Sequence, residues 1–168
     1  MLRSGFFAIL PSRGWVPQSA SDGLVVLRSP RDLGVVRCSA VRGDGAPWSA
    51  AKLASRVRAR ASGETAFDER AWSSADLRLA SCSSVLMPAL SAVSNDEPKP
   101  ALESWVSRRC WAIARADLLV DVEYTSPDPP DILVGPDGME YERRRVDVAA
   151  DMVDCEEMVR TIRIDATA

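Results

Sequence analysis

A short alternating segment, residues 118–124, constrains the fold of this 168-residue chain more than any other feature. Three apolar side chains alternate there with the acids Asp121 and Glu123. A period of two places the apolar side chains on one face of a strand and the two acids on the other. The segment therefore predicts a strand with one face in a core and one face towards solvent.

The rest of the chain predicts one hairpin, one further strand and several helices. A hairpin is predicted over residues 132–144, around the turn Gly135-Pro-Asp-Gly138, and a short closing strand over residues 161–164. The apolar spacing predicts helices over the following ranges: 47–61, 67–79, 83–93, 101–116 and 149–159. The pattern is most amphipathic over residues 101–116, so we expect this helix to be the one that packs on the sheet.

The order of these elements indicates the fold class. Helices come first, and a helix–strand–hairpin–helix–strand series follows, which is typical of α+β proteins. We predict an α+β fold with an N-terminal helical region, followed by a helix that packs on a small, mainly antiparallel sheet. The core is expected to bury six side chains together: Val106, Cys110, Ile113, Val120, Val122 and Tyr141.

Charge divides the chain. Residues 1–60 carry ten basic groups against three acids, whereas residues 61–168 carry eleven against twenty-one. We predict a basic N-terminal extension over residues 1–45 and a single α+β domain over residues 46–168, with an exposed linker at 95–100.

The acid-free, arginine-bearing start is typical of an organellar transit peptide, which predicts a mitochondrial or plastid location in a eukaryote. Alternatively the two β-type runs at residues 24–27 and 35–38 form a hairpin around turn residues, and the protein is cytoplasmic.

Composition excludes several kinds of site. The chain has no histidine, which removes the commonest general base and zinc ligand. Its four cysteines are widely spaced and form no Cys-x-x-Cys pair, so we predict no cofactor. No stretch reaches the roughly 18 apolar residues of a membrane span, so we expect a soluble chain without one.

We therefore expect a small, non-catalytic protein-binding or accessory domain. Trp105 and Trp111 lie six residues apart on the predicted helix 101–116 and cannot both face its centre, so one is a candidate anchor for a partner. The basic triplet Arg143, Arg144 and Arg145 is a second candidate, because arginine side chains bind acidic groups.

Two alternatives stay open at this point. Arg56, Arg58 and Arg60 could bind nucleic acid together with the rest of the basic segment. A divalent-metal-dependent enzyme is the other alternative, and it needs the predicted strands to be neighbours. In that arrangement four carboxylates share one sheet face: Asp121, Glu123, Glu140 and Glu142.

Overall fold

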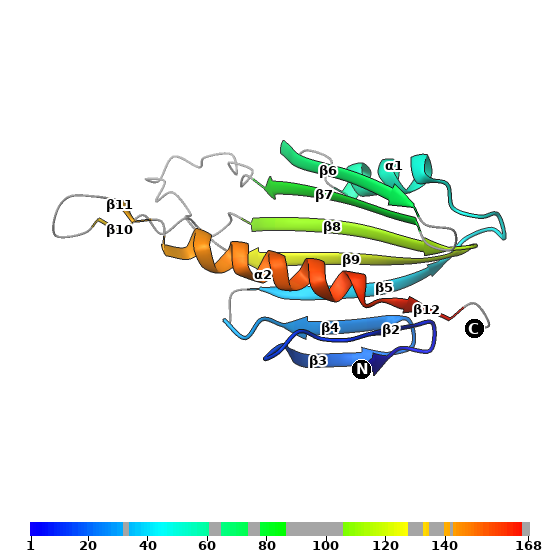
Figure 1. Ribbon diagram of the computed structural model, residues 1–168, viewed down its shortest axis with the longest axis horizontal. Helices are drawn as coiled ribbons and strands as arrows, with labels where there is room; N and C mark the ends of the chain where they lie inside the picture. Colours follow the sequence, from blue (N-terminus) through cyan, green and yellow to red (C-terminus); the bar gives the residue numbers. More distant parts are fainter. Residues whose placement is uncertain are drawn as a thin grey trace, which may run out of the picture.

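The structure is a computed structural model, and most of the chain is arranged around one long, twisted sheet (Figure 1). For some strand and helix residues, among them 143–148, it describes the backbone alone. The ranges that the structure describes are 1–31, 34–60, 65–73, 78–86, 106–127, 133–134, 140–141 and 143–165.

The main sheet has seven antiparallel strands in the spatial order β3-β4-β5-β9-β8-β7-β6. Strand β5 pairs with β9 over eight residues, so N-terminal strands and the central part of the chain share one sheet. The bounds are β3 Val16–Ser21, β4 Leu24–Arg28, β5 Val35–Arg42, β6 Thr65–Ser73, β7 Arg78–Leu86, β8 Val106–Arg115 and β9 Leu118–Pro127.

Two smaller antiparallel sheets accompany it. One joins both ends of the described chain, because β12 (Arg163–Ile164) pairs with β2 (Phe7–Ile9), which also pairs with β1 (Leu2–Arg3). The other is a two-stranded hairpin of β10 (Leu133–Val134) and β11 (Glu140–Tyr141).

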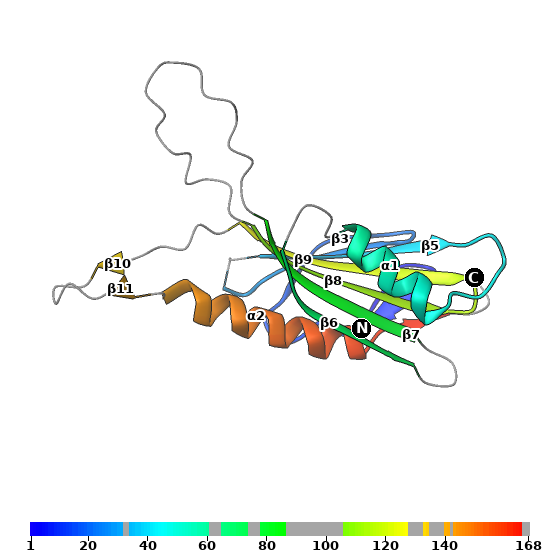
Figure 2. The ribbon, with the colours of Figure 1, turned by 90° about the horizontal axis from the view of Figure 1, so that it is seen from above.

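The two helices of the described chain lie on opposite faces of the main sheet (Figure 2). Helix α1 (Ala50–Arg60) begins after Ser49, whose hydroxyl accepts a hydrogen bond from the Lys52 backbone N–H at 3.2 Å, as an N-cap does. It packs on β6, β7 and β8. Helix α2 (Arg143–Arg160) packs on β9 from the other side. Within the described ranges, neither helix combines the length and apolar character that a membrane crossing requires.

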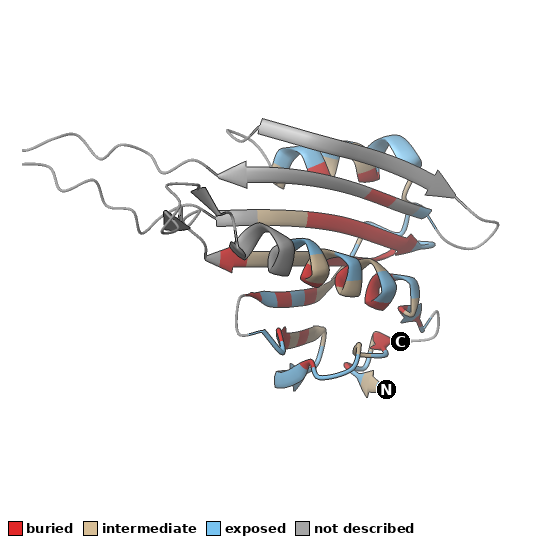
Figure 3. Ribbon diagram, turned by 60° about the vertical axis from the view of Figure 1, so that its left-hand side comes forward, coloured by how far each residue is buried: buried red, intermediate tan, exposed pale blue. Residues whose placement is uncertain are grey.

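The larger core lies on the α2 face of the sheet, where red, buried segments meet in Figure 3. It includes side chains from the main sheet, from α2 and from the small sheet, among them Trp111, Tyr124, Leu27, Met158 and Phe7. A smaller core lies under α1, where Leu53 and Val57 meet small residues of β7 and β8.

The predicted helix over residues 101–116 is wrong, because residues 106–115 form the central strand β8. Trp111 and Ile113 face the α2 core, whereas Cys110, Ala112 and Ala114 face α1. A strand that is buried on both faces is apolar at successive positions and loses its alternation, so its sequence also fits a helix.

The α+β class is confirmed, but the N-terminal region consists of strands and not of helices. The helix predicted over 67–79 is replaced by β6 and the start of β7, and the first part of the helix predicted over 83–93 belongs to β7. Residues 143–144, predicted as the end of the hairpin, belong to α2 instead.

Other predictions are confirmed. Helix α1, strand β9, the β4–β5 hairpin, the hairpin within residues 132–144, the helix at 149–159 and the closing strand all form. Of the six predicted core residues, Ile113, Val120 and Val122 are buried together, and Cys110 is buried on the other face. The side chains of Val106 and Tyr141 and the linker at 95–100 lie outside the described residues.

Candidate functional site

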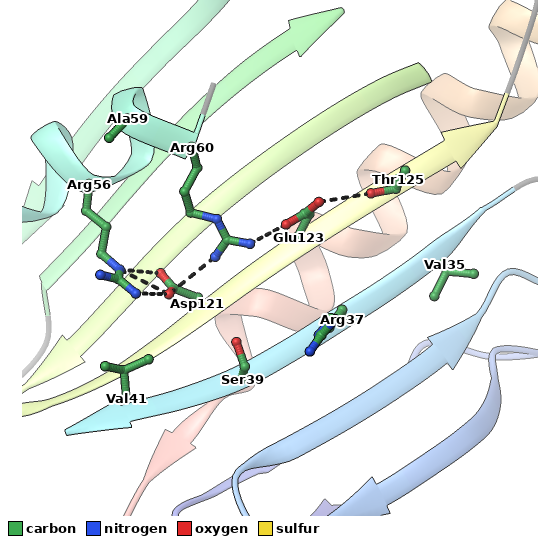
Figure 4. Close-up of a pocket in the computed structure, with 10 residues that line it drawn as sticks. All are labelled: Val35, Arg37, Ser39, Val41, Arg56, Ala59, Arg60, Asp121, Glu123 and Thr125. Carbon is green, nitrogen blue, oxygen red and sulfur yellow. Dashed lines mark hydrogen bonds and ion pairs between the residues drawn. The ribbon is translucent and has the colours of Figure 1, made fainter. Parts of the chain in front are cut away.

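A groove lies beside α1, on the part of the sheet that this helix leaves open. Its volume is about 660 Å³, and it lies over β5 and β9, with α1 as one wall (Figure 4). The floor comes from side chains two residues apart on each strand, because alternate residues of a strand face the same side. These are Val35, Arg37, Ser39 and Val41 on β5, and Asp121, Glu123 and Thr125 on β9.

Asp121 is the most buried charged group of the groove, with only 3% of its surface exposed. The Arg56 guanidinium donates to both of its oxygens, from Nε at 3.0 Å and from Nη2 at 2.5 Å. Nη1 of Arg60 lies 3.3 Å from the same carboxylate. A bidentate arginine supplies strong, charge-assisted hydrogen bonds, which allows a carboxylate to be buried at this place.

Glu123 is held in a similar way. It forms ion pairs with Arg60 and with Arg108, whose Nε lies 3.1 Å from Oε1 of the glutamate. Thr125 donates a hydrogen bond to the same oxygen at 3.3 Å. Burial alone would lower the pKa of Arg60, but the charge of Asp121, with smaller contributions from its neighbours, outweighs burial and raises that pKa.

Trp48 lies just before the start of α1 and contacts both the sheet side of the wall and Arg56. Its indole N–H donates to the Asp117 carbonyl at 3.0 Å, and the Arg56 guanidinium lies 5.7 Å from the centre of its ring. A cation at this distance from an aromatic face is attracted to the ring. Trp48 also lines a second hollow of about 440 Å³, which Lys52 and Arg42 border and which shares Val41 with the groove.

Three cations along these two hollows differ from the paired arginines. The side chains of Arg37, Arg42 and Lys52 are exposed, and none forms a hydrogen bond or ion pair with a described residue. Arg37 lies directly opposite Glu123 in the β5–β9 register, yet that glutamate is paired with Arg60 and Arg108. The two hollows together therefore have cationic groups that remain available to a ligand.

A separate polar cluster lies on the α2 face. Asp151 of α2 is fully buried, accepts a hydrogen bond from the Tyr124 hydroxyl at 3.1 Å and pairs with Arg31 at 2.6 Å. Arg31 also reaches Asp154 at 3.0 Å, and Trp15 donates its indole N–H to Asp154. The hydrogen bonds that Arg31 donates to Asp154 and Asp151 raise the pKa of its guanidinium. Because these groups bind one another, the cluster ties the turn after β4 to α2 and has a structural role.

The described cysteines are unsuited to nucleophilic chemistry. Cys38, Cys110 and Cys155 are buried. Burial raises the pKa of Cys38 to about 12, and burial together with the charge of Asp151 raises the pKa of Cys155. A thiol with a raised pKa stays protonated at neutral pH, and the protonated form is the poor nucleophile.

The sequence-predicted partner residues are separated by the structure. Trp111 is 0% exposed, so it is part of the core and is not a surface anchor. Its burial follows from the central position of β8, which the helical interpretation missed. Trp105 and the side chains of Arg143, Arg144 and Arg145 lie outside the described residues, although the backbone of the triplet forms the first turn of α2.

The basic helix residues divide by helical spacing. Arg56 and Arg60 are four residues apart, share one face of α1 and reach the carboxylates of β9. Arg58 lies two residues from each and is exposed.

The four-carboxylate face is not formed by the described strands. Asp121 and Glu123 lie on β9, whose neighbours are β5 and β8, whereas Glu140 lies on β11 in a separate hairpin. Glu142 lies outside the described residues. The two acids of β9 are paired with arginines instead, and the described residues contain no group of three metal-binding side chains.

The sequence interpretation missed Arg37, Ser39 and the two hollows. The available signal was the spacing of Arg37, Ser39 and Val41 on one face of the predicted run at 35–38 and just beyond it. That spacing indicates a shared face, but it contains no information on which strand lies beside it.

Comparison with known proteins supports the fold alone. No protein-family model matches the chain, and no curated protein matches it. A crystal structure of a protein from Bacteroides thetaiotaomicron is similar, with a TM-score of 0.50 and 10% sequence identity. The similarity covers 95% of this chain and 45% of that one, so this chain spans less than half of the similar protein.

Proposed function

We propose that this chain is a non-catalytic binding domain that holds a segment of another protein in the groove beside α1. The observation that carries the proposal is the part of the sheet that no described helix or strand covers. Helix α1 packs on β6, β7 and β8, and the α1-side face of β5 and β9 remains as the floor of an open groove.

The chemistry of the groove supports binding more than catalysis. General acid–base catalysis needs a group that can exchange a proton near neutral pH. Asp121 and Glu123 are each held by arginines, and the chain contains no histidine. The described thiols are buried away from the groove or beneath α1.

A protein segment matches the mixed character of the floor. Val35 is 37% exposed and Val41 is half-buried, which gives the groove apolar surface. The polar side chains of Ser39, Thr125 and Arg37 lie among these valines and can form hydrogen bonds with a ligand. Protein interfaces combine apolar contacts with polar groups in this way.

Site-specific photo-crosslinking tests the proposal. A photoreactive amino acid at Ser39 on the groove floor is compared with one at Arg163, an exposed residue of β12, in cells of the native host. We expect a discrete protein adduct from position 39 that is absent from position 163. The adduct partner, once purified, should bind the unmodified chain, and Ser39→Trp should weaken that binding about tenfold or more because the indole fills the groove.

Two results would contradict the proposal. One is the absence of a position-39 adduct, and the other is a purified partner that binds the Ser39→Trp variant as tightly as the unmodified chain. An adduct with nucleic acid in place of protein would favour the nucleic-acid alternative.

A further inference from the structure

We infer that the groove recognises an acidic, extended protein segment, which lies along β5 from Arg37 to the hollow bordered by Arg42 and Lys52. The inference rests on the proposed function, because it names the chemistry of the partner that the groove would hold.

Charge balance is the first argument. Three guanidinium groups line the main groove against two carboxylates, and both carboxylates are already paired with arginines. The second hollow has two cations, Arg42 and Lys52, against the single acid Asp44. Each hollow therefore has one excess positive charge, and an acidic ligand complements both.

The availability of the cations is the second argument. The charged ends of Arg37, Arg42 and Lys52 contact no partner among the described residues, so an incoming carboxylate does not have to displace an existing ion pair. Arg56 and Arg60 behave differently, since their carboxylate partners hold them as a wall. The structure thus separates the cations that shape the groove from those that can meet a ligand.

Spacing is the third argument. Arg37 and Val41 are four residues apart on the same face of one strand, and a rise of about 3.3 Å per residue separates their Cα atoms by roughly 13 Å. An extended segment covers the same length with about four residues. We therefore expect acids about four residues apart in the partner, which places both on the face of the segment that meets the sheet. An apolar side chain beside them would contact Val41, the residue shared by the two hollows.

The aromatic content of the groove favours protein over single-stranded nucleic acid. Proteins that bind single strands stack successive bases on several aromatic side chains. Among the residues that line the two hollows, Trp48 is the one aromatic, Arg56 lies over its ring, and its N–H is bonded to Asp117.

Fluorescence anisotropy with defined probes on the full chain tests the inference. The first probe is a labelled peptide with two pairs of glutamate about four residues apart and valine and serine between them. The second has glutamine in place of each glutamate, and the third is a labelled oligothymidylate. We expect the acidic peptide to bind about tenfold tighter than the glutamine peptide and to lose affinity as salt rises.

Charge reversal locates the site. Arg37→Glu and Lys52→Glu should each weaken binding of the acidic peptide about fivefold or more, and Arg163→Glu should leave it unchanged. Arg163 is a matched control, because it is also an exposed strand arginine without a described partner, on the small sheet.

Three results would overturn the inference: equal affinity for the two peptides, equal loss from Arg37→Glu and Arg163→Glu, or tighter binding of oligothymidylate than of the acidic peptide. A partner can crosslink at position 39 while the chain binds the acidic and glutamine peptides equally. That result would leave the proposed function in place and exclude the acidic segment. Loss of both the crosslink and the peptide binding would remove both.

Discussion

The two faces of the main sheet have different compositions and different roles. On the α2 face, large side chains such as Trp111 and Tyr124 fill a continuous core with α2 and the small sheet. On the α1 face, the strands carry small residues such as Ala112 under the helix. Beside the helix they carry charged residues such as Asp121. One face is closed by packing and the other remains partly open.

The comparison shows how two neighbouring strands can serve both purposes. Along β9, Val122 and Tyr124 lie in the core, whereas Glu123 between them lies in the groove. Along β5, Val36 and Cys38 are buried, whereas Arg37 is exposed. The period of two in a strand thus lets one face hold the fold together while the other face meets a ligand.

The largest predicted effect comes from the closed face. Trp111→Ala removes a fully buried side chain, and we expect it to lower the free energy of unfolding by about 3–5 kcal/mol. Val35→Ala on the open face should change it by about 0.5 kcal/mol or less, as at a surface position. Urea unfolding measures both values, and similar losses at the two positions would contradict the assignment of the faces.

A smaller effect is expected from the carboxylate under the groove wall. Asp121→Asn removes the charge that Arg56 and Arg60 share, so we expect a loss of about 1–3 kcal/mol in unfolding free energy. Adding Arg56→Gln to this variant should cost less than Arg56→Gln costs alone, because the two groups act on each other. The exposed Asp165→Asn is the control. An Asp121 variant as stable as this control would show that the pair does not hold the wall.

Alkaline pH is expected to destabilise the core on the α2 face of the sheet. The pKa of Cys38 is raised from its ordinary value of 9.0 to about 12, so the folded chain keeps a proton that the unfolded chain releases. This contribution to stability is complete below pH 9 and is lost as the pH rises towards 12. Burial also raises the pKa of Tyr124 and Cys155, which adds to the loss in the same direction.

The thiol contribution can be measured as a slope. We expect unfolding free energy to fall above pH 9, with Cys38 supplying about 1 kcal/mol per pH unit. Cys38→Ala should therefore show a shallower fall, whatever its stability at neutral pH. Parallel curves for the two chains would mean that Cys38 ionises equally in the folded and unfolded states.

Local patterns predicted some of these features. The alternation around Asp121 identified β9 and both of its faces, and the apolar spacing after Pro47 identified α1. Both are decided by side chains close in the sequence. The central strand β8 was mistaken for a helix because each of its faces is buried by a different helix, a tertiary effect that a single sequence does not contain.

The groove also depends on tertiary contacts that the sequence alone does not contain. Asp121, Glu123, Arg56 and Arg60 were each selected as candidates, but as parts of separate metal and nucleic-acid sites. Their pairing depends on α1 lying beside β9, and the ion pairs join residues more than sixty positions apart. Arg37 was not among the predicted site residues. Its place in the groove depends on β9 lying beside β5 and on α1 packing over β6, β7 and β8 instead. The organellar location stays a prediction, and N-terminal sequencing of the native protein tests it.

Thiol labelling along β5 tests the central claim, that alternate residues of this strand face a closed core and an open groove. Cys38 supplies a natural buried probe, and Arg37→Cys and Ser39→Cys place probes on either side of it. A thiol reagent and mass spectrometry give the rate at each position under native conditions. We predict rapid modification at positions 37 and 39 and modification of Cys38 only when the chain unfolds. Equal protection of all three positions would show that the α1-side face is covered, and equal reactivity would show that the α2-side core is not closed.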